Sequence, residues 1–410
     1  MNLIKNKQKI NDVNAYLLIA FAFALPLTVA GANIIDAFIV LLWLARGTFK
    51  EDWNEVKNNK VVLAVLGFYL LHIVGLLWTE DMQWGLHILK KESKFLMIPI
   101  FMLFVRQEHI KYYIYAFLAA MTLSEVLSYG VWLEIIPEFK HATVINPTPF
   151  MSHISYNPLL AFAIYLLLIS LLFDENLKKK QKILYVLFVI TMSINMFITG
   201  GRAGQVMFFT MLIIIVFQYF NSSIIKSLII SLLILPVIFI LAYKGSNIFN
   251  SRVNLAVTSV INYEEDKNTS VGQRLTYLIN SYEIIQANAI FGVGTGDFKN
   301  EYHKVNQRNT PEVTTTVNPH NMYVLELVQF GLIGFISLLS ILYYQVAFAS
   351  KNENLMLKYI GITLPLLFTV IMLSDSYLLG HYTGMLFIFF SAFIYKNYKY
   401  KTSKENKVKI

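Results

Sequence analysis

Long apolar runs, separated by short polar connections, recur along almost the whole 410-residue chain. Each run approaches or reaches the roughly 20 residues that an α-helix needs to cross about 30 Å of hydrocarbon. Such runs are expected to be helical, because backbone N–H and C=O groups find no water to bond inside lipid. The pattern predicts an all-α integral membrane protein of about twelve transmembrane helices. They are expected at 15–30, 32–45, 61–78, 95–105, 112–135, 157–173, 183–199, 204–219, 227–243, 321–348, 359–375 and 378–395.

One large hydrophilic insertion, at 244–318, interrupts the apolar pattern. Loops longer than about 15 residues are usually functional or disordered. This one mixes an apolar stretch at 282–293 with polar turns, so we expect it to be folded and partly helical. The predicted division is therefore transmembrane helices in 1–243, the large loop at 244–318, and transmembrane helices followed by a tail in 319–410.

Lysine and arginine are distributed unequally between alternate connections. The N-terminal tail, every second connection and the tail 396–410 together carry 22 of the 34 basic residues, and the opposite short connections carry five. The richer side is expected to be cytoplasmic. Both termini are then cytoplasmic, and the connection around Gly200, the connection 136–156 and the large loop face a periplasmic space.

Composition excludes several kinds of chemistry. The chain has no cysteine, which rules out disulfides, thiolate nucleophiles and cysteine–zinc sites. The net charge of +9 is carried at the ends of apolar runs and at the termini, as expected for contact with anionic lipid headgroups rather than nucleic acid. No His, Asp or Glu cluster has metal-ligand spacing, so we expect neither a metal nor another cofactor.

The sequence Asn318-Pro319-His320-Asn321 opens the apolar run at 321–348 on the outer side. Asn is a favoured N-cap and Pro a favoured first helical residue, which would place His320 in the first turn of a helix. The helix dipole disfavours an imidazolium there, so a neutral imidazole would be available as a general base. The alternative is a polar residue that merely caps an interfacial helix.

Two arginines on the expected outer side are candidate phosphate ligands. Gly201 permits a tight reversal before Arg202, whose guanidinium suits phosphate oxygens, although a snorkelling arginine at a helix end would look the same. Arg274 lies in the large loop and is either a second clamp or an exposed loop residue. Gly292 and Gly294 resemble a dinucleotide fingerprint only superficially, because no βαβ unit surrounds them, and we interpret them as a turn.

Other polar residues are weaker candidates. Lys90, Lys91 and Lys94 in the outward connection 79–94 would either attract an anionic lipid headgroup or anchor the helix at the interface. Glu125 falls within a predicted span, where a carboxylate is either functional or a packed structural group. His141 and His153 lie on the outward connection 136–156.

Taken together, these residues resemble the bacterial O-antigen ligases, which are related to Wzy-type O-antigen polymerases and to oligosaccharyltransferases that glycosylate pilins. The most specific match is His320-Asn321, nine residues, then Gly331-Leu332-Ile333-Gly334, against the ligase pattern His-Asn, nine residues, Gly-x-x-Gly. Gly201-Arg202 and Arg274 followed by Gly292-Val293-Gly294 also match in order, so the resemblance covers roughly 199–334. The run at 200–204 departs from the Ser-Arg-Gly order of many relatives, which puts its detailed geometry in doubt.

The resemblance implies glycan transfer at the outer face of the bacterial inner membrane. The donor would be a polysaccharide on undecaprenyl diphosphate and the acceptor the lipid A–core, without metal or ATP and with inversion of the anomeric centre. His320 matches the family's proposed base, and Arg202 and Arg274 match arginines thought to hold the diphosphate. Supporting residues would be Gly201, Asn318, Asn321, Gly292 and Gly294.

Three other functions stay open at this point. A Wzy-type polymerase would use the same donor but another lipid-linked repeat as acceptor, and an oligosaccharyltransferase would glycosylate protein. A single dominant outward loop favours the ligase over the polymerase. A transporter is the rival from another class, but no internal inverted repeat is evident and the candidate residues gather at one membrane face.

Overall fold

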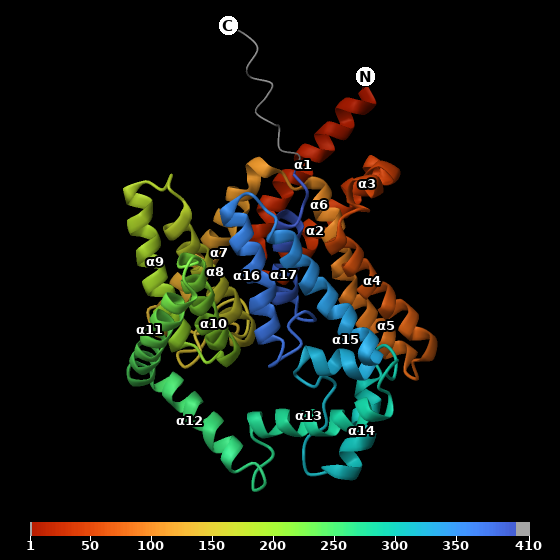
Figure 1. The fold of residues 1–410 in the computed structure, drawn as a ribbon, viewed down its shortest axis with the longest axis vertical. Coiled ribbons are helices and arrows are strands. Elements are labelled where there is room, and N and C mark those ends of the chain that lie inside the picture. The colour runs from red at the N-terminus through yellow and green to blue at the C-terminus, as the bar shows by residue number, and fades with distance from the viewer. Residues whose placement is uncertain (1, 399–410) are drawn as a thin grey trace.

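The computed structural model describes residues 2–398, and the regular secondary structure of this part is helical, with one isolated bridge between Phe139 and Ala142 in a connection (Figure 1). The predicted tail 396–410 therefore lies almost entirely outside the described residues. The first half contains α1 (Asn2–Ala24), α2 (Val29–Arg46), α3 (Phe49–Val56), α4 (Lys60–Val74), η1 (Gly75–Trp78), α5 (Met82–Glu92), η2 (Ser93–Leu96), α6 (Met97–Phe104), η3 (Gln107–His109), α7 (Ile110–Trp132), α8 (His153–Phe173) and α9 (Lys179–Ile198). The second half contains α10 (Arg202–Tyr219), α11 (Ile224–Gly245), α12 (Asn247–Ile261), α13 (Ser270–Ala287), α14 (Phe298–Asn309), α15 (Met322–Ala349), α16 (Leu355–Ile371) and α17 (His381–Ile394).

The chain is a multi-pass membrane protein. Within the described residues, 8 helices are long and apolar enough to cross a membrane, and α16 and α17 are shorter apolar helices. All the runs predicted as spans are helical, but the run 95–105 is only the last part of a longer crossing element. There α5, η2 and α6 follow one another without a break from Met82 to Phe104.

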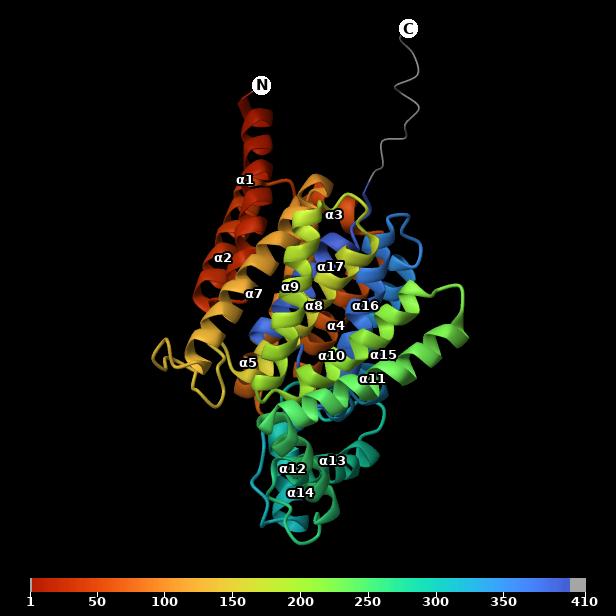
Figure 2. The ribbon, with the colours of Figure 1, turned by 90° about the vertical axis from the view of Figure 1, so that its left-hand side faces the viewer.

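The helices form one bundle with a distinct cap at one end. Figures 1 and 2 show the start of α1 and the end of α17 at one end of the bundle, and α12, α13 and α14 at the opposite end. The three capping helices come from the insertion predicted at 244–318. We call their end of the bundle the capped end. Among the membrane-length helices α8 is the most enclosed, with 78% of its apolar window buried.

Helix α15 is broken at Gly331, which corrects the expectation of one long helix at 321–348. Gly331 has φ 61° and ψ −149°, a conformation that glycine adopts without steric cost. The backbone groups freed by the break bond to the segment 289–294. Leu332 N donates to Ala289 O (2.9 Å), and Gly294 N donates to Gln329 O (2.9 Å). The broken helix therefore keeps its backbone hydrogen bonds satisfied, as a buried chain must.

The cap is also tied to the turn between α4 and α5. Thr295 Oγ1 donates to His72 O and Thr79 Oγ1 donates to Thr295 O, both at 2.7 Å. The Asp297 carboxylate accepts from the backbone amides of Glu80 (2.5 Å) and Asp81 (3.0 Å). These bonds connect residues more than 200 positions apart and hold the cap against the bundle.

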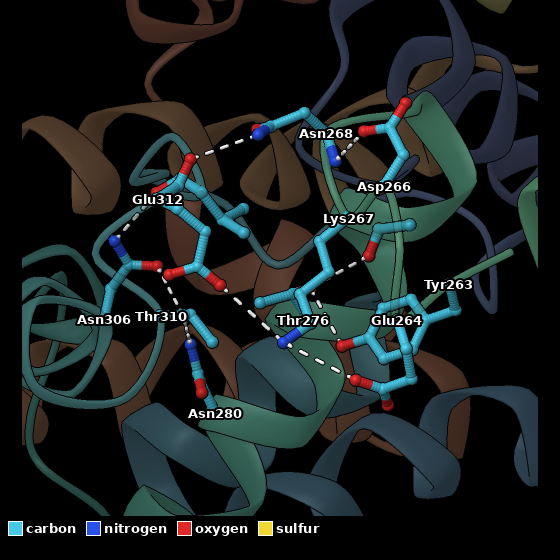
Figure 3. Close-up of polar contacts among 12 residues, drawn as sticks. Tyr263, Glu264, Asp266, Lys267, Asn268, Thr276, Asn280, Asn306, Thr310 and Glu312 are labelled. Atoms are coloured by element: carbon cyan, nitrogen blue, oxygen red, sulfur yellow. Dashed lines mark hydrogen bonds and ion pairs between the residues drawn. The ribbon is translucent and has the colours of Figure 1, made fainter.

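Within the cap, a polar network fixes α13 against the turns beside it (Figure 3). Lys267 Nζ lies 3.8 Å from Glu264 and 3.6 Å from Glu312. Asn280 Nδ2 donates to Thr310 Oγ1 (2.7 Å), which joins α13 to the end of α14. Because α13 carries Arg274, this network positions that guanidinium.

Candidate functional site

Three arginines from three helices line one cavity of about 280 Å³ at the capped end. Arg202 begins α10, Arg252 comes from α12 and Arg274 from α13. The wall is completed by His153, Ile154, Gly200, Gly201, Ala203, Ser270, Ser374 and Tyr377. We call this space the arginine cavity.

Close packing of α10 on α8 places Arg202. Gly201 precedes α10, and a Cβ atom built on it would lie 2.5 Å from the carbonyl oxygen of His153. Gly204 meets Asn157 just as closely, with its Cβ position 2.2 Å from the Asn157 Cβ. Only glycine permits this approach, which brings the first turn of α10 to the start of α8.

Ser270 joins the two arginines expected from the sequence. Arg202 Nη2 donates to Ser270 Oγ (2.6 Å), and Arg274 Nη1 donates to Ser270 O (3.4 Å). In the described part of the chain, none of the three cavity arginines forms an ion pair with a carboxylate. Their positive charges remain uncompensated by protein, which suits an anionic ligand with several oxygens.

His320 stands before α15 and outside the helix, which corrects the predicted cap. Asn321 is the N-cap, and its Oδ1 accepts from Tyr323 N (3.0 Å) and Val324 N (3.2 Å). The backbone of His320 is left-handed, with φ 52°, rather than helical. His320 therefore does not lie in the first turn of α15, and the expected effect of the helix dipole on its imidazole does not apply.

A carboxylate governs that environment instead. His320 Nδ1 lies 3.2 Å from Asp375 Oδ1, and the two side chains are 35% and 16% exposed. Tyr277 of α13 packs on the other side of the imidazole, with ring centroids 6.1 Å apart and an interplanar angle of 24°. Tyr277 follows Arg274 by one helical turn, so α13 contacts both the histidine and the arginine cavity.

Asn318 connects His320 to the turn between α16 and α17. Its Oδ1 accepts from His320 N (3.0 Å) and from Ser376 Oγ (2.8 Å). Its Nδ2 donates to Asp375 Oδ1 (3.3 Å). One amide side chain thus holds both the left-handed backbone of His320 and the carboxylate beside it.

The electrostatics keep Asp375 ionised. Burial raises the pKa of this carboxyl, but His320, the Ser376 amide and the charge of Arg274 outweigh burial and lower the pKa below its ordinary value of 3.8. The ionised carboxylate of Asp375 thus faces His320 Nδ1 across 3.2 Å.

His320 lines neither the arginine cavity nor the cavity next to it, but its partner Asp375 lines that neighbouring cavity. Asn318, Asp375 and Ser376 line a second cavity of about 290 Å³, which we call the central cavity. Ile154 and Tyr377 line both the central cavity and the arginine cavity. Arg202 and Arg274 therefore line one cavity, and His320 contacts Asp375 in the wall of the neighbouring central cavity.

The remaining predicted residues have other surroundings. Gly292 and Gly294 lie against the broken turn of α15, as part of the segment 289–294, and line neither cavity. Glu125 is a buried residue of α7, only 2% exposed, and it also lines neither cavity. Among the described residues, no three His, Asp or Glu side chains are placed to hold a metal ion.

Sequence reasoning missed four residues of this site. Arg252 and Ser270 lie in the insertion, where nothing in the local pattern distinguishes them from other polar loop residues. Asp375 and Ser376 had a usable signal, since they lie at the outer end of the apolar run predicted at 359–375 and in the short connection that follows it. A carboxylate at that place, on the same predicted face as His320, could have been recognised as its partner.

The fold and the site define a class: a multi-pass helical membrane protein with an uncompensated cationic cavity beside a His–Asp pair. Residues 187–339 match the O-antigen ligase family. The segment contains Arg202, Arg274 and His320. The chain is also 25% identical over 311 residues to an uncharacterised protein of Haemophilus influenzae, covering 73% of this chain and 74% of that protein.

Proposed function

We propose that this protein transfers a polysaccharide from undecaprenyl diphosphate to the lipid A–core at the periplasmic face of the bacterial inner membrane. The observation that carries the proposal is the arginine cavity adjoining the His320–Asp375 pair. A diphosphate neutralised by guanidinium groups is a good leaving group, so catalysis consists mainly of positioning and electrostatic stabilisation. The family match supports lipid-linked glycan transfer as the reaction class.

In the proposed reaction, an acceptor hydroxyl attacks the anomeric carbon of the donor sugar. The bond from that carbon to the diphosphate oxygen breaks, and its electron pair leaves with undecaprenyl diphosphate between Arg202, Arg252 and Arg274. The hydroxyl proton passes to His320 Nε2, while Asp375 stabilises the imidazolium through Nδ1. Attack opposite the leaving group inverts the anomeric configuration.

The proposed orientation places the capped end in the periplasm and both termini in the cytoplasm, with about twelve membrane crossings. An apolar cavity of about 480 Å³ between α8, α9, α10 and α11 supports a polyprenyl donor. Ser246 and Phe197 line it near the capped end, and Phe197 also stacks on Phe249 at the start of α12. This helix carries Arg252, so a polyprenyl chain and its diphosphate would have neighbouring binding places.

The acceptor is tested with purified protein in detergent, supplied with a defined undecaprenyl diphosphate glycan. Lipid A–core, a second lipid-linked repeat and a peptide are offered as separate acceptors. We expect transfer to lipid A–core, and expect His320→Ala to lower its rate by about 10²- to 10⁴-fold while folding is retained. Transfer only to the lipid-linked repeat would identify a polymerase, and transfer only to the peptide an oligosaccharyltransferase; either would reject the ligase.

A deletion strain gives an independent readout. Loss of a ligase strands long chains on undecaprenyl, whereas loss of a polymerase leaves the core capped with a single repeat. We expect the first result.

A further inference from the structure

A third cavity, of about 600 Å³, lies on the other side of the central cavity and is rich in lysine. Its polar wall comes from the first half of α2, the first turn of α17 and the segment α5–η2. The polar residues that matter here are Asp36, His87, Lys90, Lys91, Lys94 and His381. We call this space the lysine cavity.

The positive charge of the lysine cavity is only partly balanced. Asp36 is the one carboxylate in its lining. Within residues 2–398, none of the lysines Lys90, Lys91 and Lys94 forms an ion pair with a carboxylate. Glu92 is buried and does not line the cavity, but its carboxyl group interacts electrostatically with Lys94 and Lys91, so it offsets part of their charge from behind the wall.

Two further observations show that this is a built cavity rather than a group of surface lysines. Lys94 Nζ donates to Gly380 O (3.1 Å), so its ammonium is held at the first turn of α17. His381 Nε2 is buried and has no hydrogen-bond partner. A buried polar atom without a partner is uncommon in folded proteins and calls for a ligand or water.

The lysine cavity shares wall residues with the central cavity. Lys91 and Leu379 line both the lysine cavity and the central cavity. The central cavity in turn shares Ile154 and Tyr377 with the arginine cavity. The central cavity, with Asp375 in its wall, thus has a cationic space on either side, and only the arginine cavity is assigned to the donor.

We propose that the lysine cavity binds a phosphate group of the acceptor glycolipid and so brings its sugar hydroxyl toward His320. This inference rests on the proposed function. A base between donor and acceptor requires the two substrates to approach it from different sides. Met97, Leu379 and Met385 give the cavity an apolar side, and Ile34 and Phe38 of the adjoining helix α2 are 56% and 54% exposed, as expected for a lipid-facing surface. An amphiphile can therefore place its phosphate among the lysines while its acyl chains stay in lipid.

The test is a binding experiment with full-length protein in phosphatidylcholine nanodiscs. Lipid A and enzymatically dephosphorylated lipid A are titrated against the wild type and against the double variant Lys91→Gln, Lys94→Gln. Losing charge-assisted contacts should weaken lipid A binding about tenfold or more and should leave the dephosphorylated lipid unaffected. Lys244→Gln is the matched control, since Lys244 is exposed at the end of α11 and lines none of the three cavities.

Unchanged lipid A binding by the double variant would overturn the inference. The inference would also be overturned if the double variant lost undecaprenyl diphosphate binding instead of lipid A binding. Displacement of lipid A by equimolar inorganic phosphate would overturn it as well. Retained undecaprenyl diphosphate binding shows that the double variant is folded.

The binding readout requires no turnover, so it separates the two proposals. If the wild type transfers glycan to no lipid acceptor but binds lipid A through these lysines, the proposed reaction fails and the anion site stands. If transfer to lipid A–core occurs with the same acceptor KM in the double variant, the reaction stands and the lysine cavity is rejected.

Discussion

His320 owes its position to side chains distant in sequence. Its left-handed backbone is a conformation that L residues adopt at a cost of about 1–2 kcal/mol, and Asn318 stabilises it by accepting the His320 amide proton. Asn318 also bonds to Ser376 and Asp375. The imidazole is therefore presented by two connections at once, the one before α15 and the one between α16 and α17.

Replacing Asp375 tests the role of the carboxylate. Asp375→Asn keeps the size of the side chain but removes the charge that stabilises an imidazolium, so we expect the transfer rate to fall on the order of 10- to 100-fold. The Kd for the donor should change little, because Asp375 does not line the arginine cavity. The Ser376→Ala variant, which loses only the bond to Asn318, should be affected less. A larger loss in Ser376→Ala would contradict the assignment.

The lowered pKa of Asp375 also predicts a pH dependence of stability. A carboxyl whose pKa is lower in the folded protein than in the unfolded chain stabilises the fold above its unfolded value of about 3.9. That contribution is lost as the pH falls through the lowered folded value. Thermal unfolding in detergent should therefore show a constant gap in Tm between the wild type and Asp375→Asn at neutral and mildly acidic pH, which closes only below about pH 4. A gap that closes at pH values well above this range would refute the charged pair.

The arginine cavity predicts a strict requirement for guanidinium geometry. Arg202→Lys and Arg274→Lys keep the charge but lose the planar, two-pronged guanidinium group. Losing one charge-assisted hydrogen bond should lower the affinity for the donor about 10- to 100-fold. Arg308→Lys is the control, because Arg308 pairs with Glu283 on the outside of the cap. Donor binding in nanodiscs is the measurement. Wild-type affinity in both cavity variants would exclude the clamp.

At the scale of elements, the broken helix α15 and the segment 289–294 form one unit. The break exposes backbone groups that a continuous helix would satisfy itself, and the segment restores their hydrogen bonds. Gly292 makes the approach possible, since a Cβ atom on it would lie 2.3 Å from Gln329 C and Phe330 N. Helix α15 begins after Asn321, which directly follows His320, so the position of this unit also affects the position of His320.

Gly292→Ala should therefore destabilise the protein by at least about 2 kcal/mol, from its positive φ together with the steric clash. Gly47 offers a matched comparison, because it has a nearly identical φ of 65° and no heavy atom within 4 Å of the Cβ position. Gly47→Ala should show the backbone cost alone. The check is thermal unfolding of both variants in detergent. Equal destabilisation would mean that the contact with α15 contributes nothing.

Local pattern predicted the helical segments well and their junctions poorly. The apolar runs are long enough to identify α8 or α11 from hydropathy alone, because lipid accepts no other backbone structure there. The break at Gly331 was not predicted, since a glycine inside an apolar run looks the same whether or not a distant segment takes over its hydrogen bonds. His320 and Arg202 could be singled out from their neighbouring residues, whereas Arg252 and Ser270 became visible only through contacts across the fold.

At the scale of the molecule, the proposed orientation makes a labelling prediction. The chain has no cysteine, so single introduced thiols give an unambiguous signal. Gln307→Cys, exposed on α14, should react with a membrane-impermeant thiol reagent in intact spheroplasts. Glu353→Cys, exposed between α15 and α16, should react only after the membrane is permeabilised. The reverse labelling pattern would show that the topology is the opposite one, and the capped end could then not be periplasmic.

The adjacent positions of the cavities have a consequence for the order in which the two substrates bind. Ile154 and Tyr377 form the wall that the arginine cavity and the central cavity share, so the two cavities are separate but adjacent. A donor seated on the guanidinium groups leaves room for the second lipid to arrive, so no glycosylated enzyme has to form between two half-reactions. Initial-rate plots at several fixed donor concentrations should accordingly give lines that intersect, the signature of a ternary complex, rather than the parallel lines of a ping-pong cycle.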